Sequence, residues 1–170
     1  MNTNLIFILF PIFFMIHEFE EIIMIEKWME KYCLDLCRRF PGISRHLSKL
    51  KGIDTRNFSI IVAEEFLIVS LLTIVSILTN NVVYWYCGLA AFSIHLIIHI
   101  FQFIIWKGYI PAIVTTIFCI PYCVIAIYKA SCILALSELF IYAMISFVIS
   151  AVNLVIMHKL VSKSILGNNS

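Results

Sequence analysis

The sequence predicts an all-α membrane protein, a polytopic bundle of about five transmembrane helices with an amphipathic interfacial helix between the first two. Composition is the first reason: 62% of the 170 residues are hydrophobic, 13% are charged, and the mean hydropathy is +1.02. Soluble domains carry about 25% charged residues. The second reason is spacing, because apolar runs long enough to cross a core of ~30 Å alternate with short polar turns. We predict a single membrane domain over residues 1–170, with spans at about 5–25, 58–78, 82–106, 109–128 and 132–157.

The only extended polar segment, residues 26–56, holds eight of the twelve lysines and arginines. Its first part, 26–40, is predicted to be an amphipathic helix at the membrane surface, anchored by Trp28 and Tyr32 and ended by Pro41. We expect the basic side chains to hold the segment against anionic lipid headgroups, at about 1 kcal/mol each. The net charge of +2 gives no reason to expect nucleic acid as a partner. The basic residues expected at the headgroups are Arg38, Arg39, Arg45, Lys49 and Lys51.

The basic residues also predict the orientation in the cell membrane, because cytoplasmic loops are rich in lysine and arginine. With residues 26–56 in the cytoplasm, five spans place the N-terminus outside and the C-terminus inside. Eleven of the twelve basic residues then fall on the cytoplasmic side, and only Lys129 falls outside. The N-terminus lacks a basic region and a cleavage signal, so we expect a retained span rather than a signal peptide.

The six cysteines predict neither a disulfide framework nor a thiolate zinc site. Cys33 and Cys37 are four residues apart, as are Cys119 and Cys123. This spacing is typical of small apolar residues on one helix face. No serine nucleophile motif, phosphate-binding loop or nucleotide fingerprint is present either, so the chemistry must come from other residues.

One stretch near the end of the first span carries its ionisable groups, His17-Glu18-Phe19-Glu20-Glu21. Glu20 and Glu21 follow His17 by three and four residues, so all three side chains project from one face of a helix. An acidic residue at the centre of a bilayer costs roughly 2.5–3.5 kcal/mol on insertion scales. These side chains must therefore face polar partners inside the bundle or bind a ligand.

A second polar stripe lies in the third span, where His95, His99 and Gln102 follow one another at i, i+4 and i+7. Two histidines four residues apart can reach one metal ion from a single helix face. The alternative is a pair of histidines that hydrogen-bond to carboxylates of neighbouring helices. At ~1.5 Å per residue, these groups share a depth in the cytoplasmic half with polar residues of other spans. The other members of this layer are Glu64, Glu65 and Asn153, with only one of the two glutamates expected to face the histidines.

The order of these motifs resembles the family of small bacterial and archaeal integral membrane proteins named for its HxxEE motif. The resemblance covers nearly the whole chain and implies several membrane spans, but it brings no settled activity. It implies a glycine after the proline that opens the fourth span, where this chain has Ala112. The residues that carry the resemblance are His17, Glu20 and Glu21, the pair Glu64-Glu65, His95, His99 and Gln102, and the run from Tyr109 through Pro111 to Thr115.

A divalent metal, zinc or iron, would satisfy this polar layer and would make the protein a metal-dependent hydrolase. Its substrate would be apolar or membrane-embedded, such as a lipid or a peptide bond near the cytoplasmic surface. Two other functions fit the same layer: a proton or cation path, and a scaffold or immunity-type protein whose polar side chains only hold the helices together. In the hydrolase interpretation the candidate metal ligands are His17, Glu21, Glu64, Glu65, His95 and His99, the candidate general base is Glu20, and Gln102 and Asn153 line the site.

Overall fold

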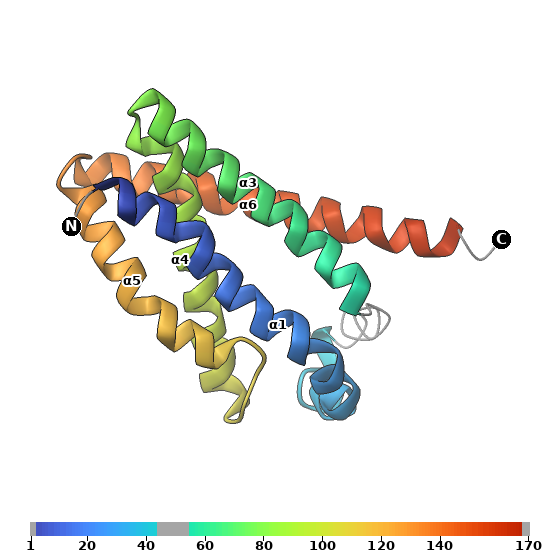
Figure 1. Ribbon diagram of the computed structural model, residues 1–170. Coiled ribbons are helices and arrows are strands. Elements are labelled where there is room, and N and C mark those ends of the chain that lie inside the picture. The colour runs from blue at the N-terminus through green and yellow to red at the C-terminus, as the bar shows by residue number, and fades with distance from the viewer. Residues whose placement is uncertain (1–2, 44–54, 168–170) are drawn as a thin grey trace.

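The computed structural model describes residues 3–43 and 55–167, and it is helical throughout those ranges apart from turns. Consecutive long helices run in opposite directions, so that α1 begins at one end of the bundle and α6 ends at the other (Figure 1). The all-α fold class predicted from the sequence is confirmed. In chain order the elements are α1 (Thr3–Arg39), the 3-10 helix η1 (Pro41–Ile43), α3 (Thr55–Thr79), α4 (Val82–Trp106), α5 (Ile113–Ser131) and α6 (Leu136–Gly167).

Four helices are long and apolar enough to cross a membrane: α3, α4, α5 and α6 as far as Val161. The remaining long helix of the described residues, α1, carries the ionisable stretch around His17. It lies between α3 and α5 and contacts both (Figure 1). The crossing of the membrane by α1, and hence the orientation of the two ends of the chain, remains a prediction.

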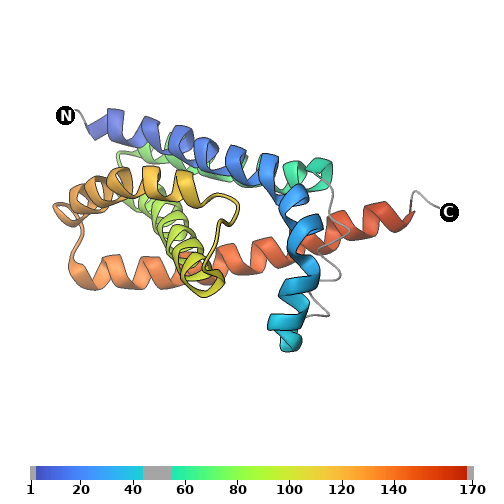
Figure 2. The same ribbon diagram turned by 90° about the horizontal axis from the view of Figure 1, so that it is seen from below.

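The predicted interfacial helix over 26–40 is the continuation of α1 rather than a separate element. α1 runs without interruption for 37 residues, because neither glycine nor proline occurs between Pro11 and Pro41. Figure 2 shows its later, lighter-blue part turning away from the direction of its first part. The predicted basic contacts of Arg45, Lys49 and Lys51 lie outside the described residues.

The later part of α1 packs on the connection between α4 and α5. Trp28 Nε1 donates a hydrogen bond of 2.8 Å to the carbonyl of Tyr109. The Arg39 guanidinium donates to the carbonyl oxygens of Trp106 at 3.0 Å and Ile105 at 2.6 Å. These carbonyls belong to the last turn of α4, where no intrahelical donor is available. Arg39, which we expected at lipid headgroups, therefore caps α4 in this structure.

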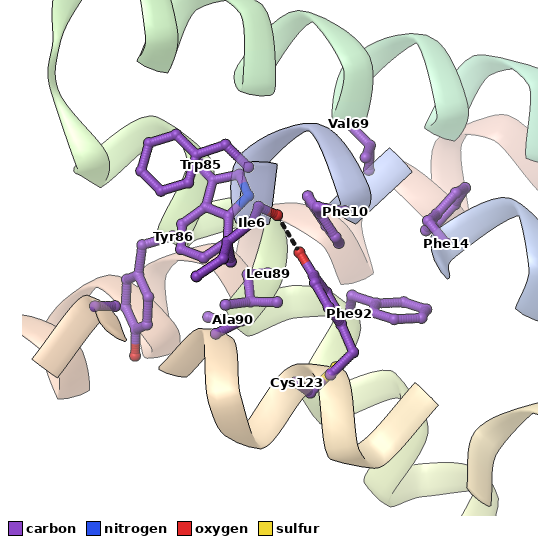
Figure 3. Close-up of a cluster of buried hydrophobic side chains, with 14 of the residues drawn as sticks. Ile6, Phe10, Phe14, Val69, Trp85, Tyr86, Leu89, Ala90, Phe92 and Cys123 are labelled. Atoms are coloured by element: carbon purple, nitrogen blue, oxygen red, sulfur yellow. Dashed lines mark hydrogen bonds between the residues drawn. The ribbon is translucent and has the colours of Figure 1, made fainter. Parts of the chain in front are cut away.

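The main core joins the first half of α1 to α4 and α5 through aromatic side chains (Figure 3). The Trp85 ring stacks on Phe7 with centroids 4.4 Å apart and meets Phe10 edge-on at 6.4 Å. The Tyr122 hydroxyl donates to the carbonyl of Ile6 at 2.8 Å, the dashed line in Figure 3. A Cβ at Gly88 would lie 3.0 Å from Phe10 Cε1, so the absence of a side chain there lets α1 approach α4 closely. This packing fixes α1 in rotation and so determines which residues face α4.

The connection between α4 and α5 turns at Ala112, where φ is 66° and the side chain is fully buried. The left-handed region costs a residue other than glycine about 1–2 kcal/mol. Glycine adopts it without that cost, which accounts for the glycine that the family resemblance implies here. α5 begins at Ile113, four residues later than predicted, because residues 109–112 form this turn.

Replacement of Ala112 by valine should lower the free energy of unfolding by about 2 kcal/mol or more, because a β-branched side chain adds strain and volume at a filled, left-handed position. Ala112→Gly should stay within about 1 kcal/mol of the wild type, since relief of strain and loss of a buried methyl group oppose each other. Denaturant unfolding of the purified protein in mild detergent measures both variants. A valine variant as stable as the wild type would contradict the left-handed turn.

Candidate metal centre

α1 directs its polar side chains toward three neighbouring helices. His17 and Glu21, one turn apart, face the histidines of α4. Glu20 points to the first turn of α5, and Glu26 accepts hydrogen bonds from the backbone N–H, at 3.0 Å, and the hydroxyl of Thr55, the first residue of α3. These hydrogen bonds from Thr55 lower the pKa of Glu26. Successive helix residues lie about 100° apart, so neighbours in the motif can serve different helices.

Four side chains bring one ligand atom each to a common point between α1 and α4: His17, Glu21, His95 and His99. These atoms all lie within 4.8 Å of one another. His95 Nε2 is 2.9 Å from His99 Nε2, and Glu21 Oε2 is 3.8 Å and 3.6 Å from these two nitrogens. Ligands of a tetrahedral zinc ion with bonds of ~2.0–2.1 Å lie roughly 3.3 Å apart. Small side-chain movements are therefore sufficient for this group to hold an ion.

His17 completes the group from a fully buried position. Its ring centroid lies 5.2 Å from that of His95 and 5.1 Å from that of His99, in edge-on contact. Its Nδ1 is 3.5 Å from the Thr115 hydroxyl, whereas its Nε2 has no hydrogen-bond partner among the described residues. A buried polar atom without a partner costs about 1–3 kcal/mol, and a bound cation would remove that cost.

Glu20, our predicted general base, lies outside the group of four. Its Oε1 accepts a hydrogen bond of 2.8 Å from the Tyr109 hydroxyl, and its Oε2 accepts from the Thr115 backbone N–H and hydroxyl, both at 2.7 Å. Burial and the bond to Glu20 raise the pKa of Tyr109 to about 12, so this hydroxyl remains a donor at neutral pH. The carboxylate sits at the N-terminus of α5, where free N–H groups and the helix dipole favour an anion.

Glu18, to which the sequence analysis assigned no role, lies close to the histidines of α4. It is 3% exposed, and its Oε1 is 3.9 Å from His95 Nε2. It accepts no hydrogen bond from the described residues and interacts electrostatically with Glu21 and Glu65. One sequence signal could have indicated this position of Glu18. It directly follows His17, so its side chain is rotated by about 100° around α1, toward α3.

The two adjacent glutamates of α3 have different partners. Glu64 Oε2 accepts a hydrogen bond of 3.0 Å from Asn153 Nδ2 of α6, so this pair joins α3 to α6. Glu65 instead interacts electrostatically with Glu21 and is the member that faces the centre. Gln102 is exposed, because seven residues carry it about 10 Å along α4 from His95 on the same helix face.

A family model described as a protein of unknown function with HXXEE motif matches residues 8–126. The chain belongs to the HXXEE family. The matched region contains all four convergent side chains and Glu20, whereas α6, with Asn153 and the half-buried His158, lies beyond it. No curated protein and no solved structure gave a match.

The side chains of the HXXEE motif of this chain face two different helices, α4 and α5. Its histidine and final glutamate, His17 and Glu21, belong to the convergent group. Its middle glutamate, Glu20, binds the first turn of α5. This division explains the spacing of the motif, because residues i and i+4 share a face while i+3 is turned toward the neighbouring helix.

Proposed function

We propose that His17, Glu21, His95 and His99 bind one divalent metal ion, zinc or iron, inside the helix bundle. The observation that carries the proposal is the convergence within 4.8 Å of four ligand atoms, one of them from His17, a fully buried histidine whose Nε2 has no hydrogen-bond partner among the described residues. Three imidazoles with one carboxylate suit zinc or iron. Calcium and magnesium prefer sites made entirely of oxygen ligands.

The charges of the bundle support a bound cation. Glu18, Glu21 and Glu65 interact with one another across α1 and α3. Buried charges are paired with opposite charges or coordinate metal ions, because burial of an isolated carboxylate is very costly. A divalent ion would supply positive charge, which these helices lack because they contain no lysine or arginine around the centre. Neither lysine nor arginine occurs in residues 3–25, 57–106, 113–128 or 136–158.

We further propose that the centre hydrolyses a bond in an apolar, membrane-embedded substrate, such as a lipid or a peptide bond. A divalent metal ion lowers the pKa of a water molecule bound to it and so makes a nucleophile available at neutral pH. Glu18 is the carboxylate placed to accept the proton of that water, since it lies beside the histidines and carries no competing hydrogen bond from the described residues. We therefore propose Glu18 instead of Glu20 as the general base, because both carboxylate oxygens of Glu20 accept hydrogen bonds from Tyr109 and Thr115.

The exposure of His95 supports an apolar substrate. Its side chain is 39% exposed, whereas that of His99 is 6% exposed, so His95 forms the open side of the group. It lies eleven residues, about 16 Å, from the end of α4, close to the middle of the helix. If α4 crosses the membrane, a molecule that reaches His95 from outside the bundle comes from the lipid phase.

The hydrolase proposal predicts that Glu18→Gln keeps the metal and loses turnover by about 100-fold or more, the usual contribution of a general base. The assay uses metal-loaded protein in nanodiscs, with release of fatty acid from phospholipids and cleavage of an embedded peptide followed by mass spectrometry. Glu64→Gln is the matched control, because its carboxylate serves Asn153 instead of the centre. Metal-loaded protein that turns over neither substrate would overturn the hydrolase proposal and leave the metal centre standing.

One observation favours proton or cation passage as the second candidate. Polar side chains continue from the centre across the bundle, from Glu65 to the hydrogen bond between Glu64 of α3 and Asn153 of α6. His158 of α6 interacts electrostatically with Glu21 and extends this layer. Proteoliposomes with a pH-sensitive dye inside decide this alternative: a proton flux lost in Glu65→Gln supports it, and impermeable vesicles exclude it.

A further inference from the structure

The hydrogen bonds around Thr115 decide which nitrogen of His17 carries the ring proton. The Thr115 hydroxyl has one proton and three neighbours: Glu20 Oε2 at 2.7 Å, the Ala112 carbonyl at 3.2 Å and His17 Nδ1 at 3.5 Å. The carboxylate is both the nearest and the strongest acceptor, so the hydroxyl donates to Glu20. The Thr115 oxygen can then act toward His17 Nδ1 only as an acceptor. That contact is favourable only when Nδ1 carries the ring proton.

We propose that Glu20 and Thr115 together hold His17 in the tautomer with its proton on Nδ1, so that Nε2 is left bare and available to a metal ion. A neutral imidazole has a single N–H, so Nε2 in this tautomer is an acceptor only. This nitrogen is buried and has no partner in the described part of the chain. A metal ion binds through such a lone pair. The inference rests on the proposed metal centre and adds the device that prepares one of its ligands.

Glu20 and Thr115 are positioning residues in this arrangement, acting on the metal through His17. Two further hydrogen bonds keep Glu20 beside Thr115. The Tyr109 hydroxyl donates to Oε1, and the Thr115 backbone N–H donates to Oε2, the oxygen that also accepts from the Thr115 hydroxyl. All three polar residues of the HXXEE motif then contribute to one centre: His17 and Glu21 offer ligand atoms, and Glu20 orients His17 by way of α5. Removal of such outer partners of a metal-bound histidine weakens metal binding by roughly 10- to 100-fold.

Zinc affinity of Thr115 variants tests the proposal. Thr115→Val keeps the shape of the side chain and removes the hydroxyl, and we expect it to weaken zinc binding by about 10- to 100-fold. Thr115→Ser restores the hydroxyl and should restore the affinity. Glu64→Gln is the matched control, because its carboxylate binds Asn153 and makes no contact with Thr115 or His17. Competition with a chelator, using purified full-length protein in detergent, measures all four affinities.

The tautomer itself is measured without metal, by nitrogen NMR of wild-type protein labelled with 15N-histidine. The His17 signals are identified by their loss in His17→Gln, and we expect the proton on Nδ1. A proton on Nε2 in the wild type overturns the proposal, as does a folded Thr115→Val variant that binds zinc as tightly as the wild type. Wild-type protein that binds neither zinc nor iron overturns the proposed metal centre instead, and the NMR measurement still decides the tautomer.

Discussion

Metal content should fall from about one ion per chain to background when His99 is replaced by alanine. The side chain supplies one of four convergent ligand atoms, and its Nε2 lies 2.9 Å from His95 Nε2 and 3.6 Å from Glu21 Oε2. Loss of a direct ligand should cost more than the roughly 10- to 100-fold in affinity that outer partners contribute. Elemental analysis of protein purified without chelators, together with zinc and iron titrations, gives both the stoichiometry and the affinity.

The control for His99→Ala is Glu64→Gln, a change in the same layer of the bundle. Glu64 binds Asn153 and lies outside the convergent group, so its variant should keep the metal content of the wild type. Equal metal content in wild type and His99→Ala would contradict the metal centre. Loss of metal in Glu64→Gln but not in His99→Ala would move the ion to the interface of α3 and α6.

Phe10→Ala should lower the free energy of unfolding by about 3–5 kcal/mol, the range measured for aromatic-to-alanine changes in packed cores. Phe10 is 0% exposed and lies 5.9 Å and 6.4 Å, between ring centroids, from Phe92 and Trp85. Its removal leaves a cavity where α1 meets α4, so contacts with neighbouring rings are lost without replacement. Unfolding in mixed detergent micelles, followed by circular dichroism and tryptophan fluorescence, measures the change.

Phe140→Ala is the matched control for Phe10, because it removes the same atoms from the outer face of α6. Phe140 is 68% exposed, and lipid or detergent replaces the lost contacts there. We expect a change within about 0.5 kcal/mol, as for exposed positions generally. Equal effects of the two substitutions would show that the aromatic cluster of Figure 3 does not hold α1 against α4.

Sequence reasoning was most successful where a local signal is sufficient. α4 has the predicted bounds because Asn81 caps its first turn, accepting from the Val83 N–H, and Lys107 ends it in a left-handed conformation. The pairing of His17 with Glu21, and of His95 with His99, follows from the four-residue spacing alone. The two pairs were expected to meet because ionisable side chains avoid lipid and the order of the predicted spans gives both pairs a similar depth; their ligand atoms lie within 4.8 Å of one another.

The remaining features depend on which helices become neighbours, and no local pattern contains that information. Glu20 was assigned as the base because it shares a face with His17, but α5 lies beside that face and its N-terminus takes the carboxylate. Glu18 was given no role in the sequence analysis, yet the close approach of α3 and α4 encloses it with Glu65 and His95. The uninterrupted α1 was missed because the change to polar composition at residue 26 resembles a boundary.

The hydrogen bonds of α1 have a consequence for the order in which the chain is assembled during synthesis. α1 leaves the ribosome before the other described helices, but Thr55, the partner of Glu26, follows that glutamate by 29 residues, and Thr115, the partner of Glu20, follows its glutamate by 95. If α1 crosses the membrane, these acidic groups must stay near water until then, because unpaired carboxylates are costly in hydrocarbon. We therefore expect α1 to take its final place late, after α5 has been synthesised. Chains truncated before α5 should remain incompletely assembled and be removed by membrane proteases.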